Sequence, residues 1–226
     1  MLDARLQLAL QMMEACDLGA DIGTDHALLP CMALKTGIAR HMLLIDISPS
    51  ALEHARQTVH QFHLEQYTTL RCGRGLEALD ERCDCISVTG MGGITCANIL
   101  LEHPEKLMGA TLVLGPQRDE DHVRTALMHL KYRIVQERLC HAGGRYYILI
   151  QAKPGDCCMN DEAIRFGSLI YQNPDPLLKG YLEHCIQRLE GVLSSLHHAT
   201  LPSSGQIQQT EADLTFYKAR YKELFT

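Results

Sequence analysis

Apolar residues follow two kinds of spacing along the first 155 residues of the chain. Some stretches repeat them every three or four positions, as amphipathic helices do, and others gather them into short continuous runs that are typical of buried strands. The predicted helices cover residues 5–16, 28–37, 49–62 and 120–132. The predicted strands cover residues 18–22, 41–47, 68–73, 83–93 and 109–116.

Signals at the ends of the runs support these boundaries. Pro30 falls in the first turn of its predicted helix, where a missing N–H costs nothing, and Gly37 ends that helix. Ser48 is a suitable N-cap for the helix that Pro49 opens. The sequence therefore predicts sharply bounded helices after the first two strands.

The order of the elements predicts the fold class. Strands that alternate with helices indicate an α/β protein with a parallel sheet, and residues 133–153 add two strands that reverse at Gly143 and Gly144. Five parallel strands followed by a reversed pair fit the Rossmann-like sheet of class I methyltransferases better than a plain dinucleotide-binding fold.

Beyond residue 154 the chain reads as helical. Residues 152–161 are a candidate linker and residues 201–205 a candidate turn. Apolar positions on both sides of the turn alternate in steps of four and three, which predicts a coiled-coil seam. These positions are Leu178, Leu182, Cys185, Leu189, Val192, Leu196, Ile207, Thr210, Leu214, Tyr217, Tyr221 and Leu224. We predict a sheet domain at 1–154 and, at 155–226, a helical (coiled-coil) hairpin. In the alternative, these helices cover a flank of the sheet domain.

Composition places the chain among globular proteins, with 46% hydrophobic and 21% charged residues. No apolar run reaches the roughly 18 residues of a membrane span, and residues 1–10 read as a helix rather than a signal peptide. The ten cysteines form no C-x-x-C pair, which argues against a zinc site. We therefore predict a protein of the reducing cytoplasm, with no membrane partner and no metal. We also expect a monomer, although nothing in the sequence determines the oligomeric state.

The stretch A-D-I-G-T-D-H-A-L-L-P at 20–30 places two carboxylates and an imidazole between a strand and a helix. Ligands of open parallel sheets bind beyond the carboxyl ends of the strands. There Gly23 would let a ligand approach the backbone, and Asp46, at the end of the second strand, would accept hydrogen bonds from ribose hydroxyls. Alternatively, both are ordinary turn and strand-end residues.

The charge of this loop discriminates between cofactors. A dinucleotide site uses G-x-G-x-x-G, whose second glycine lets a pyrophosphate rest on a helix N-terminus. Here Asp25 stands at that position and would repel a pyrophosphate. S-adenosylmethionine (SAM) carries a sulfonium and an ammonium group but no phosphate, so the loop favours SAM over NAD.

A second glycine-rich stretch, T-G-M-G-G at 89–93, ends the fourth strand. It would let a planar base or the cofactor come close to the backbone, although a plain tight turn is an equal alternative. The Asn/Asp-Pro-Pro-aromatic run that amino-directed methyltransferases place here is absent, which points towards a ring nitrogen or another acceptor.

With R-G-L-E-A-L at 74–79, G-G-R-Y-Y-I-L-I at 143–150 and F-G-S-L-I at 166–170, these stretches resemble the TrmK family, bacterial tRNA (adenine-22-N1)-methyltransferases. The resemblance runs from about residue 4 to the C-terminus. It implies a class I methyltransferase domain, a C-terminal coiled-coil hairpin, SAM as methyl donor and tRNA as substrate.

The resemblance also implies roles for individual residues. Asp25 and His26 match the pair that faces the acceptor base, and we predict that they are catalytic. The predicted cofactor-binding residues are Asp21, Gly23, Thr24, Asp46, Ile47, Gly75, Leu76, Gly90, Met91 and Gly92. The chain departs from the family pattern at Leu28, where tyrosine is usual, at Arg74, where Asn or Asp is usual, and at Gly115, in a stretch that usually reads L-Q-P-N.

Transfer to N1 of adenine needs no prior deprotonation, because N1 has an in-plane lone pair. The product ring is cationic, so the Asp25 carboxylate could hold the base and stabilise the growing charge. In the alternative, His26 only caps the loop backbone.

The net charge of −6 argues against bulk nucleic-acid binding, but a local patch can still bind phosphates. Residues 118–153 contain seven basic and four acidic residues. The predicted tRNA-binding residues are Gly93, Arg118, Arg124, Lys131, Arg133 and Arg145. The alternatives are an ordinary solvated face, a methyltransferase for another substrate, and a non-catalytic SAM- or RNA-binding module.

Overall fold

The computed structural model describes residues 2–172, 175–198 and 204–226. The chain divides into two compact units, Met1–Gln172 and Asn173–Thr226, which are described separately.

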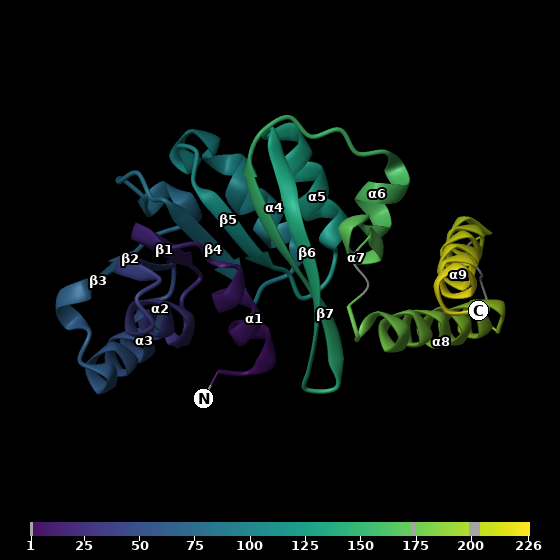
Figure 1. Cartoon of the computed structure of the whole chain (residues 1–226), viewed down its shortest axis with the longest axis horizontal. Helices are drawn as coiled ribbons and strands as arrows, with labels where there is room; N and C mark the ends of the chain where they lie inside the picture. Colours follow the sequence, from purple (N-terminus) through teal and green to yellow (C-terminus); the bar gives the residue numbers. More distant parts are fainter. Residues whose placement is uncertain (1, 173–174, 199–203) are drawn as a thin grey trace. The chain divides into compact units, whose positions relative to one another are not determined.

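The first unit is built on a seven-stranded sheet with the order β3-β2-β1-β4-β5-β7-β6 (Figure 1). The strands are β1 Cys16–Ile22, β2 Ala39–Asp46, β3 Thr68–Cys72, β4 Cys85–Thr89, β5 Thr111–Gly115, β6 Tyr132–Ala142 and β7 Arg145–Pro154. The first five pair in parallel, whereas β7 pairs antiparallel with both β5 and β6. The predicted fold class, a Rossmann-like α/β sheet closed by a reversed pair, is confirmed.

Helices cover both faces of this sheet. Contacts link α1 to α2 and α2 to α3 on one side, and α4 to α5 on the other (Figure 1). The helices of the first unit are α1 Ala4–Met12, α2 Leu28–Lys35, α3 Pro49–Phe62, α4 Gly93–Glu102, α5 Glu120–His129, α6 Asp161–Phe166 and α7 Leu169–Gln172. Three short 3-10 helices are η1 Glu65–Tyr67, η2 Gly75–Ala78 and η3 Pro104–Leu107.

The predicted helix ends match their local chemistry. The Ser48 side chain accepts a hydrogen bond from the Ala51 amide and caps α3, with Pro49 at its first position. Gly37 follows α2 with a φ of +74°, a left-handed conformation that favours glycine. Gly143 and Gly144 both have positive φ in the β6–β7 turn, which is the geometry that matches the twist of a hairpin.

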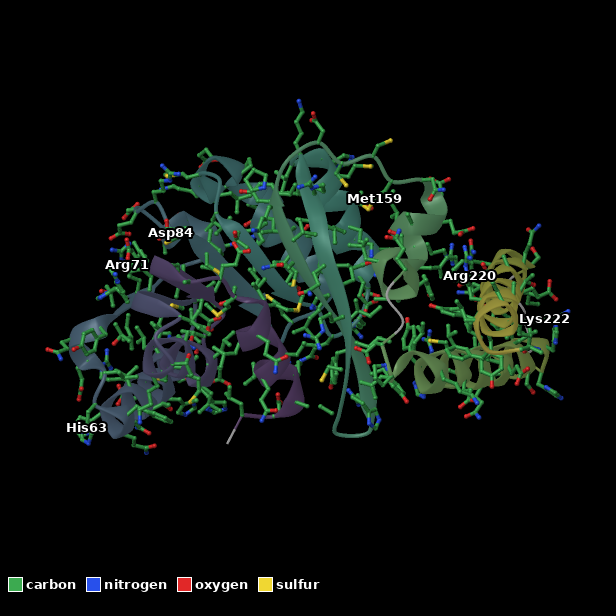
Figure 2. All side chains as sticks on the ribbon, viewed as in Figure 1. His63, Arg71, Asp84, Met159, Arg220 and Lys222 are labelled. Atoms are coloured by element: carbon green, nitrogen blue, oxygen red, sulfur yellow. The ribbon has the colours of Figure 1, made fainter. Side chains whose placement is uncertain are left out.

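One carboxylate holds the central strands together at their amino-terminal edge. Asp84, labelled in Figure 2, precedes β4, and its Oδ2 accepts hydrogen bonds from the amides of Asp17 and Leu18 at 3.0 and 3.1 Å. The strand order reverses between β1 and β4, so a ligand crevice is expected at the opposite, carboxyl-terminal edge of these strands.

A buried ion pair fixes the segment after β7. Arg124 on α5 and Glu137 on β6 are each 1% exposed and lie 2.7 Å apart, Nε to Oε1. The Arg124 guanidinium also donates to the carbonyl of Ile164 at 3.1 Å, and Glu137 Oε2 accepts from the Ser168 amide at 3.2 Å. A Cβ at Gly167 would lie 2.8 Å from the guanidinium, so this position requires glycine.

This ion pair explains a difference from the predicted domain boundary. The sequence placed the boundary between residues 154 and 155, whereas the first compact unit extends to Gln172. Residues 164–169 supply the backbone partners of the buried pair, so α6 and α7 belong to the sheet unit. The glycine of the F-G-S-L-I motif therefore has a packing role.

The second unit consists of α8 Leu178–His197 and α9 Ser204–Phe225, which pack against each other. The heptad residues Leu178, Leu182, Cys185, Leu189, Thr210 and Tyr217 are buried. Val192 is 42% exposed, so the predicted seam weakens near the end of α8. The coiled-coil winding stays a prediction. Of the predicted turn at 201–205, residues 201–203 lie outside the described part, and Ser204 and Gly205 belong to α9.

Seven of the ten cysteines are buried, as predicted for small hydrophobic residues. Burial raises the pKa of Cys83, Cys85 and Cys96 to about 12, which keeps these groups neutral. In the described parts of the chain, no helix is both long and apolar enough to cross a membrane.

We expect Arg124→Met to lower the free energy of unfolding by about 3–5 kcal/mol, because it leaves the Glu137 charge buried without its partner. Urea unfolding followed by circular dichroism measures the effect. Arg133→Met removes an exposed arginine near the start of β6 and should change little. The Arg124→Met/Glu137→Leu double variant should recover part of the loss. A cost below about 1 kcal/mol for the single variant, the range of exposed ion pairs, would contradict a stabilising role.

Candidate active site

The loop between β1 and α2 is anchored on the neighbouring strand. The amides of Gly23 and Thr24 both donate to the carbonyl of Ile45 on β2, at 2.8 and 3.2 Å. Ala27 then adopts a φ of +50° at the start of α2. These contacts hold the intervening residues Asp25 and His26 at the surface, where both are exposed.

Asp21 is the buried acid of this site. Its Oδ1 accepts a hydrogen bond from the Ser87 hydroxyl on β4 at 2.6 Å. Burial raises the pKa of the Asp21 carboxyl to about 6, against the opposing effect of the Ser87 hydrogen bond. The carboxylate charge therefore has a free-energy cost in the folded protein, and a cationic ligand would reduce that cost.

Two glycine-containing loops meet beside this acid. A Cβ at Gly23 would lie 2.4 Å from the terminal methyl carbon of Met91, so the methionine side chain fills the space that the glycine leaves. Gln117, after β5, donates from its side chain to the Gly90 carbonyl at 2.7 Å and from its amide to the Met91 carbonyl at 2.9 Å. The loop after β4, residues 90–92 (the strand-four loop), is thus supported by residues that follow both neighbouring strands, β1 and β5.

Gly93 has a structural role that the sequence did not indicate. It is buried, its amide donates to the Arg118 carbonyl at 2.8 Å, and a Cβ there would lie 1.9 Å from the Asp119 carbonyl oxygen. The predicted tRNA contact at Gly93 is contradicted by this burial, because the backbone of the next loop occupies the adjacent space.

A pocket of about 400 Å³ opens at the carboxyl ends of β1, β2 and β4. Seven predicted site residues line it: Asp21, Gly23, Asp25, His26, Asp46, Gly90 and Met91. The predicted cofactor residues Thr24, Ile47, Gly75, Leu76 and Gly92 lie outside this lining. Leu76 is 1% exposed and packs in the core, whereas Ile47 is 67% exposed.

The N-terminal helix contributes to the pocket through residues that the sequence analysis missed. Asp3, Arg5 and Leu6 of this region are part of the lining. A Cβ at Gly90 would lie 3.6 Å from Arg5 Nη1, which places the guanidinium beside the strand-four loop. Gln117 also lines the pocket. Only the folded chain reveals these neighbours, because they are far from residues 20–30 and 89–93 in sequence.

Asp25 lies between two imidazole rings at the pocket mouth. Its Oδ1 is 3.2 Å from His54 Nδ1 on α3, and its Oδ2 is 3.4 Å from His26 Nε2. The two rings stack with their centroids 5.6 Å apart. His54 was not predicted as a site residue, because a lone histidine on an amphipathic helix carries no signal.

The structure does not gather the predicted basic residues into one patch. Arg118 follows β5 and Arg145 begins β7, and both are exposed at the pocket side of the sheet. Lys131 and Arg133 lie at the other end of β6, whose 11 residues span about 33 Å. Figure 1 shows the β6–β7 turn projecting from one end of the sheet. The burial of Arg124 contradicts its predicted role in binding tRNA phosphates.

Comparison with known proteins agrees with this geometry. Residues 2–150 match the family of methyltransferase domains. The chain belongs to the methyltransferase domain family. Its predicted enzyme class is thereby supported by both the sheet order and the sequence match.

Relatives of this methyltransferase domain include RNA-modifying enzymes. The chain is 32% identical over 157 residues to the tRNA (adenine(22)-N(1))-methyltransferase of Bacillus subtilis, a match that spans 69% of this chain and 66% of that relative. The structure resembles that of a putative tRNA (m1A22) methyltransferase of Streptococcus pneumoniae in complex with S-adenosyl-L-methionine, with a TM-score of 0.87, 24% identity and coverage of 98% and 100% of the two chains. It also resembles a Streptococcus agalactiae protein of the NADB-Rossmann superfamily, with a TM-score of 0.89, 26% identity and coverage of 98% and 97%.

The raised pKa of Asp21 makes the stability of the methyltransferase unit depend on pH. Because the folded pKa of about 6 exceeds the ordinary value of 3.8, the folded chain holds a proton that the unfolded chain releases between these values. The contribution of Asp21 to the free energy of unfolding is thus most favourable below pH 4 and is lost as pH rises through 6, a change of about 3 kcal/mol.

We expect the free energy of unfolding of the native chain to fall relative to that of Asp21→Asn between pH 4 and pH 7, measured by urea titration at each pH. Ser87→Ala should move the window to higher pH, because it removes the hydrogen bond that stabilises the ionised carboxyl. Parallel pH curves for the native chain and Asp21→Asn would contradict the raised pKa.

Proposed function

We propose that this protein is a SAM-dependent tRNA methyltransferase that methylates N1 of adenine 22. The observation that carries the proposal is the pocket at the carboxyl ends of β1, β2 and β4, where four acids of a methyltransferase domain, Asp3, Asp21, Asp25 and Asp46, line one cavity. A phosphate-free, cationic cofactor suits such a pocket better than a dinucleotide. The relationship to the B. subtilis enzyme supports tRNA as the substrate.

The residues present fit SAM, which supplies an electrophilic methyl group when bound. Asp21 would stabilise its positively charged end, because the buried carboxyl has a raised pKa and gains most from a nearby cation. Asp46 Oδ1 accepts from the Ser48 amide at 2.7 Å, so the carboxylate is fixed in place to receive ribose hydroxyls. Arg5, at the pocket wall, is the cation for the carboxylate of the methionine portion.

Asp25 would position the acceptor base. The carboxylate is exposed at the pocket mouth and is kept in place by His26 and His54. It would hold the exocyclic amine of adenine, so that N1 faces the methyl group, and it would stabilise the positive charge of the methylated ring. N1 needs no general base, so a fixed carboxylate is sufficient.

The tRNA would lie across the pocket side of the sheet. Arg118 and Arg145 are exposed there and are the first phosphate-binding candidates. Lys131 and Arg133, which the sequence grouped with them, would contact only a tRNA segment that reaches the opposite edge. The C-terminal helical unit is a second tRNA-holding arm in this proposal. The proposal includes a cytoplasmic location, because tRNA and the methyl donor are both found there. It also includes a monomeric state.

The direct test incubates unmodified tRNA with the purified chain and SAM and measures the nucleosides by mass spectrometry. We expect 1-methyladenosine in tRNA that carries adenine 22 and none when that base is replaced. Binding of SAM without methylation of any tRNA would instead support a non-catalytic module. Methylation of a small metabolite but not of tRNA would support another substrate.

Asp25→Asn should retain SAM binding but lower the single-turnover rate about 100-fold or more, because an amide cannot stabilise the cationic product ring as a carboxylate does. The rate is followed by transfer of labelled methyl groups to saturating tRNA. Glu53→Gln, which neutralises an exposed carboxylate on the outer face of α3, is the matched control and should retain the native rate. An unchanged rate in Asp25→Asn would remove this carboxylate from the mechanism.

The affinity for tRNA should fall steeply with salt concentration, because bound phosphates release counterions. Arg118→Ala and Arg145→Ala should each reduce the slope of log affinity against log salt by about 1. Arg133→Ala, at the other edge of the sheet, should leave the slope unchanged. Filter-binding titrations at several salt concentrations measure all three, and a flat dependence in the native chain would contradict phosphate binding at these arginines.

A further inference from the structure

Three metal-ligating side chains converge at the pocket mouth. In the described parts of the chain, Asp25, His26 and His54 form a group whose potential ligand atoms all lie within 4.8 Å of one another. The loop before α2 supplies two of them and α3 supplies the third. Their side chains are 58%, 65% and 53% exposed, so a hydrated ion can reach them.

We propose that these three residues form a binding site for a divalent transition-metal ion such as Zn²⁺. Two imidazole nitrogens and one carboxylate are the donors that Zn²⁺, Co²⁺ and Ni²⁺ accept, whereas Mg²⁺ and Ca²⁺ prefer oxygen ligands. Three protein ligands leave further coordination positions for water, as in open zinc sites.

The spacing of the three donors is compatible with a shared ion after a small movement of the side chains. Asp25 Oδ1 lies 3.2 Å from His54 Nδ1 and Asp25 Oδ2 lies 3.4 Å from His26 Nε2, so a single coordinating oxygen must turn towards one of the two imidazoles. Two ligands of a tetrahedral Zn²⁺ ion with bonds of about 2.0–2.1 Å lie about 3.3–3.4 Å apart. The two nitrogens, within 4.8 Å, would have to approach by at most about 1.5 Å.

The sequence argument against a metal concerned cysteine motifs, and this donor set contains none. His54 is 28 positions after His26, so no local spacing marks the site. The anchoring of Gly23 and Thr24 on Ile45 brings the loop to α3 and assembles the three ligands. The metal site is therefore a property of the fold.

A metal at this position would act as an inhibitor. It would occupy the Asp25 carboxylate, which the proposed function assigns to the acceptor base, so this consequence rests on that function. The cofactor residues Asp21 and Asp46 are not among the metal ligands, so SAM binding is expected to continue. The metal would thus block base placement and leave the methyl donor bound.

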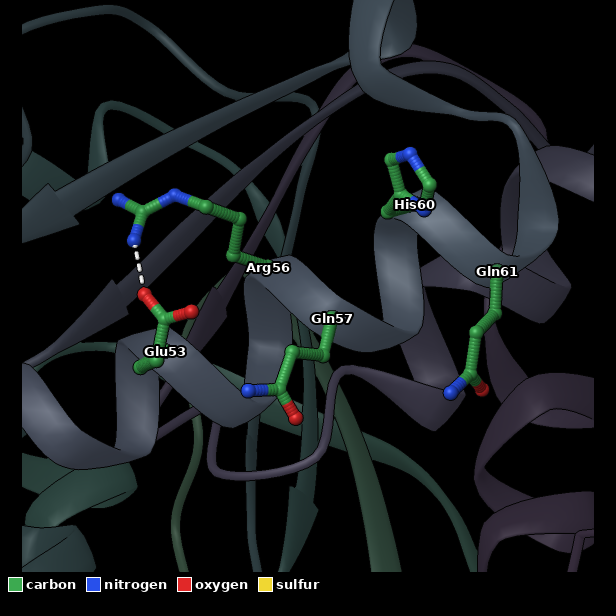
Figure 3. A pocket seen from close by; sticks show the side chains of 5 residues that line it. All are labelled: Glu53, Arg56, Gln57, His60 and Gln61. Atoms are coloured by element: carbon green, nitrogen blue, oxygen red, sulfur yellow. Dashed lines mark hydrogen bonds and ion pairs between the residues drawn. The ribbon is translucent and has the colours of Figure 1, made fainter.

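The first experiment measures Zn²⁺ binding to the full chain without a histidine tag, by isothermal titration calorimetry. We expect one equivalent to bind to the native chain and the affinity to fall at least about tenfold in His54→Gln, because one of three ligands is lost. His60→Gln is the matched control, because His60 lies on the same helix but outside the cluster, among the polar residues that line a separate pocket on α3 (Figure 3). Equal affinity in the native chain and in folded His54→Gln would overturn the proposal.

Exposed thiols need a separate control. Cys72 and Cys158 are exposed and Cys157 is partly exposed, and thiolates also bind Zn²⁺. Replacing all three by serine should leave the affinity unchanged. The spectrum of the Co²⁺-loaded native chain should likewise lack thiolate-to-cobalt charge-transfer absorption. Loss of binding in the serine variant would assign the ion to the cysteines and overturn the site at Asp25.

The second experiment measures methyl transfer to tRNA at increasing Zn²⁺ concentrations, each rate relative to the metal-free rate of the same variant. The native chain and His60→Gln should be inhibited, and EDTA should restore their rates, whereas His54→Gln should be inhibited only at about tenfold higher Zn²⁺. Equal inhibition of all variants would overturn the inhibitory role. If the native chain methylates no tRNA, the proposed function fails, but calorimetry still decides the metal site.

Discussion

The hydrogen bond between the Asp21 carboxylate and the Ser87 hydroxyl is the interaction on which the site depends. It joins the two central strands, β1 and β4, where the order of the sheet reverses. Burial raises the pKa of the Asp21 carboxyl, so its ionised form has a free-energy cost in the folded chain. A cationic ligand relieves this cost, which links binding to the stability of the sheet.

The two motif loops are parts of one packing arrangement. Met91 from the strand-four loop fills the space left open by Gly23 in the first loop, and Gln117 supports the strand-four loop from β5. The glycines of these two loops therefore have two structural roles. Gly23 leaves room for a neighbouring side chain, and Gly93 lets the Asp119 backbone approach, so close approach of a ligand is not the only reason for glycine here.

The fold was predictable because its signals are local. Caps such as Ser48 and stops such as Gly37 lie next to the elements that they bound, and the alternation of helices and strands predicts a parallel sheet. The site was predictable only in part. Asp21, Gly23, Asp25 and Asp46 lie at or just beyond the ends of strands and could be located. Arg5 lines the pocket and His54 contacts Asp25 only through tertiary packing. A basic sequence segment, likewise, does not reveal that an arginine such as Arg124 is buried.

The buried ion pair between Arg124 on α5 and Glu137 on β6, together with its backbone partners at 164–169, determines where the polypeptide can be divided. A fragment that ended at the last residue of β7 would expose the paired charges of Arg124 and Glu137 to solvent and remove the backbone groups that satisfy them. A fragment that keeps these contacts must therefore extend at least through Leu169. An insertion within the predicted linker at 152–161 would separate β7 from the residues that satisfy the buried pair, whereas one after Gln172 would leave these contacts intact.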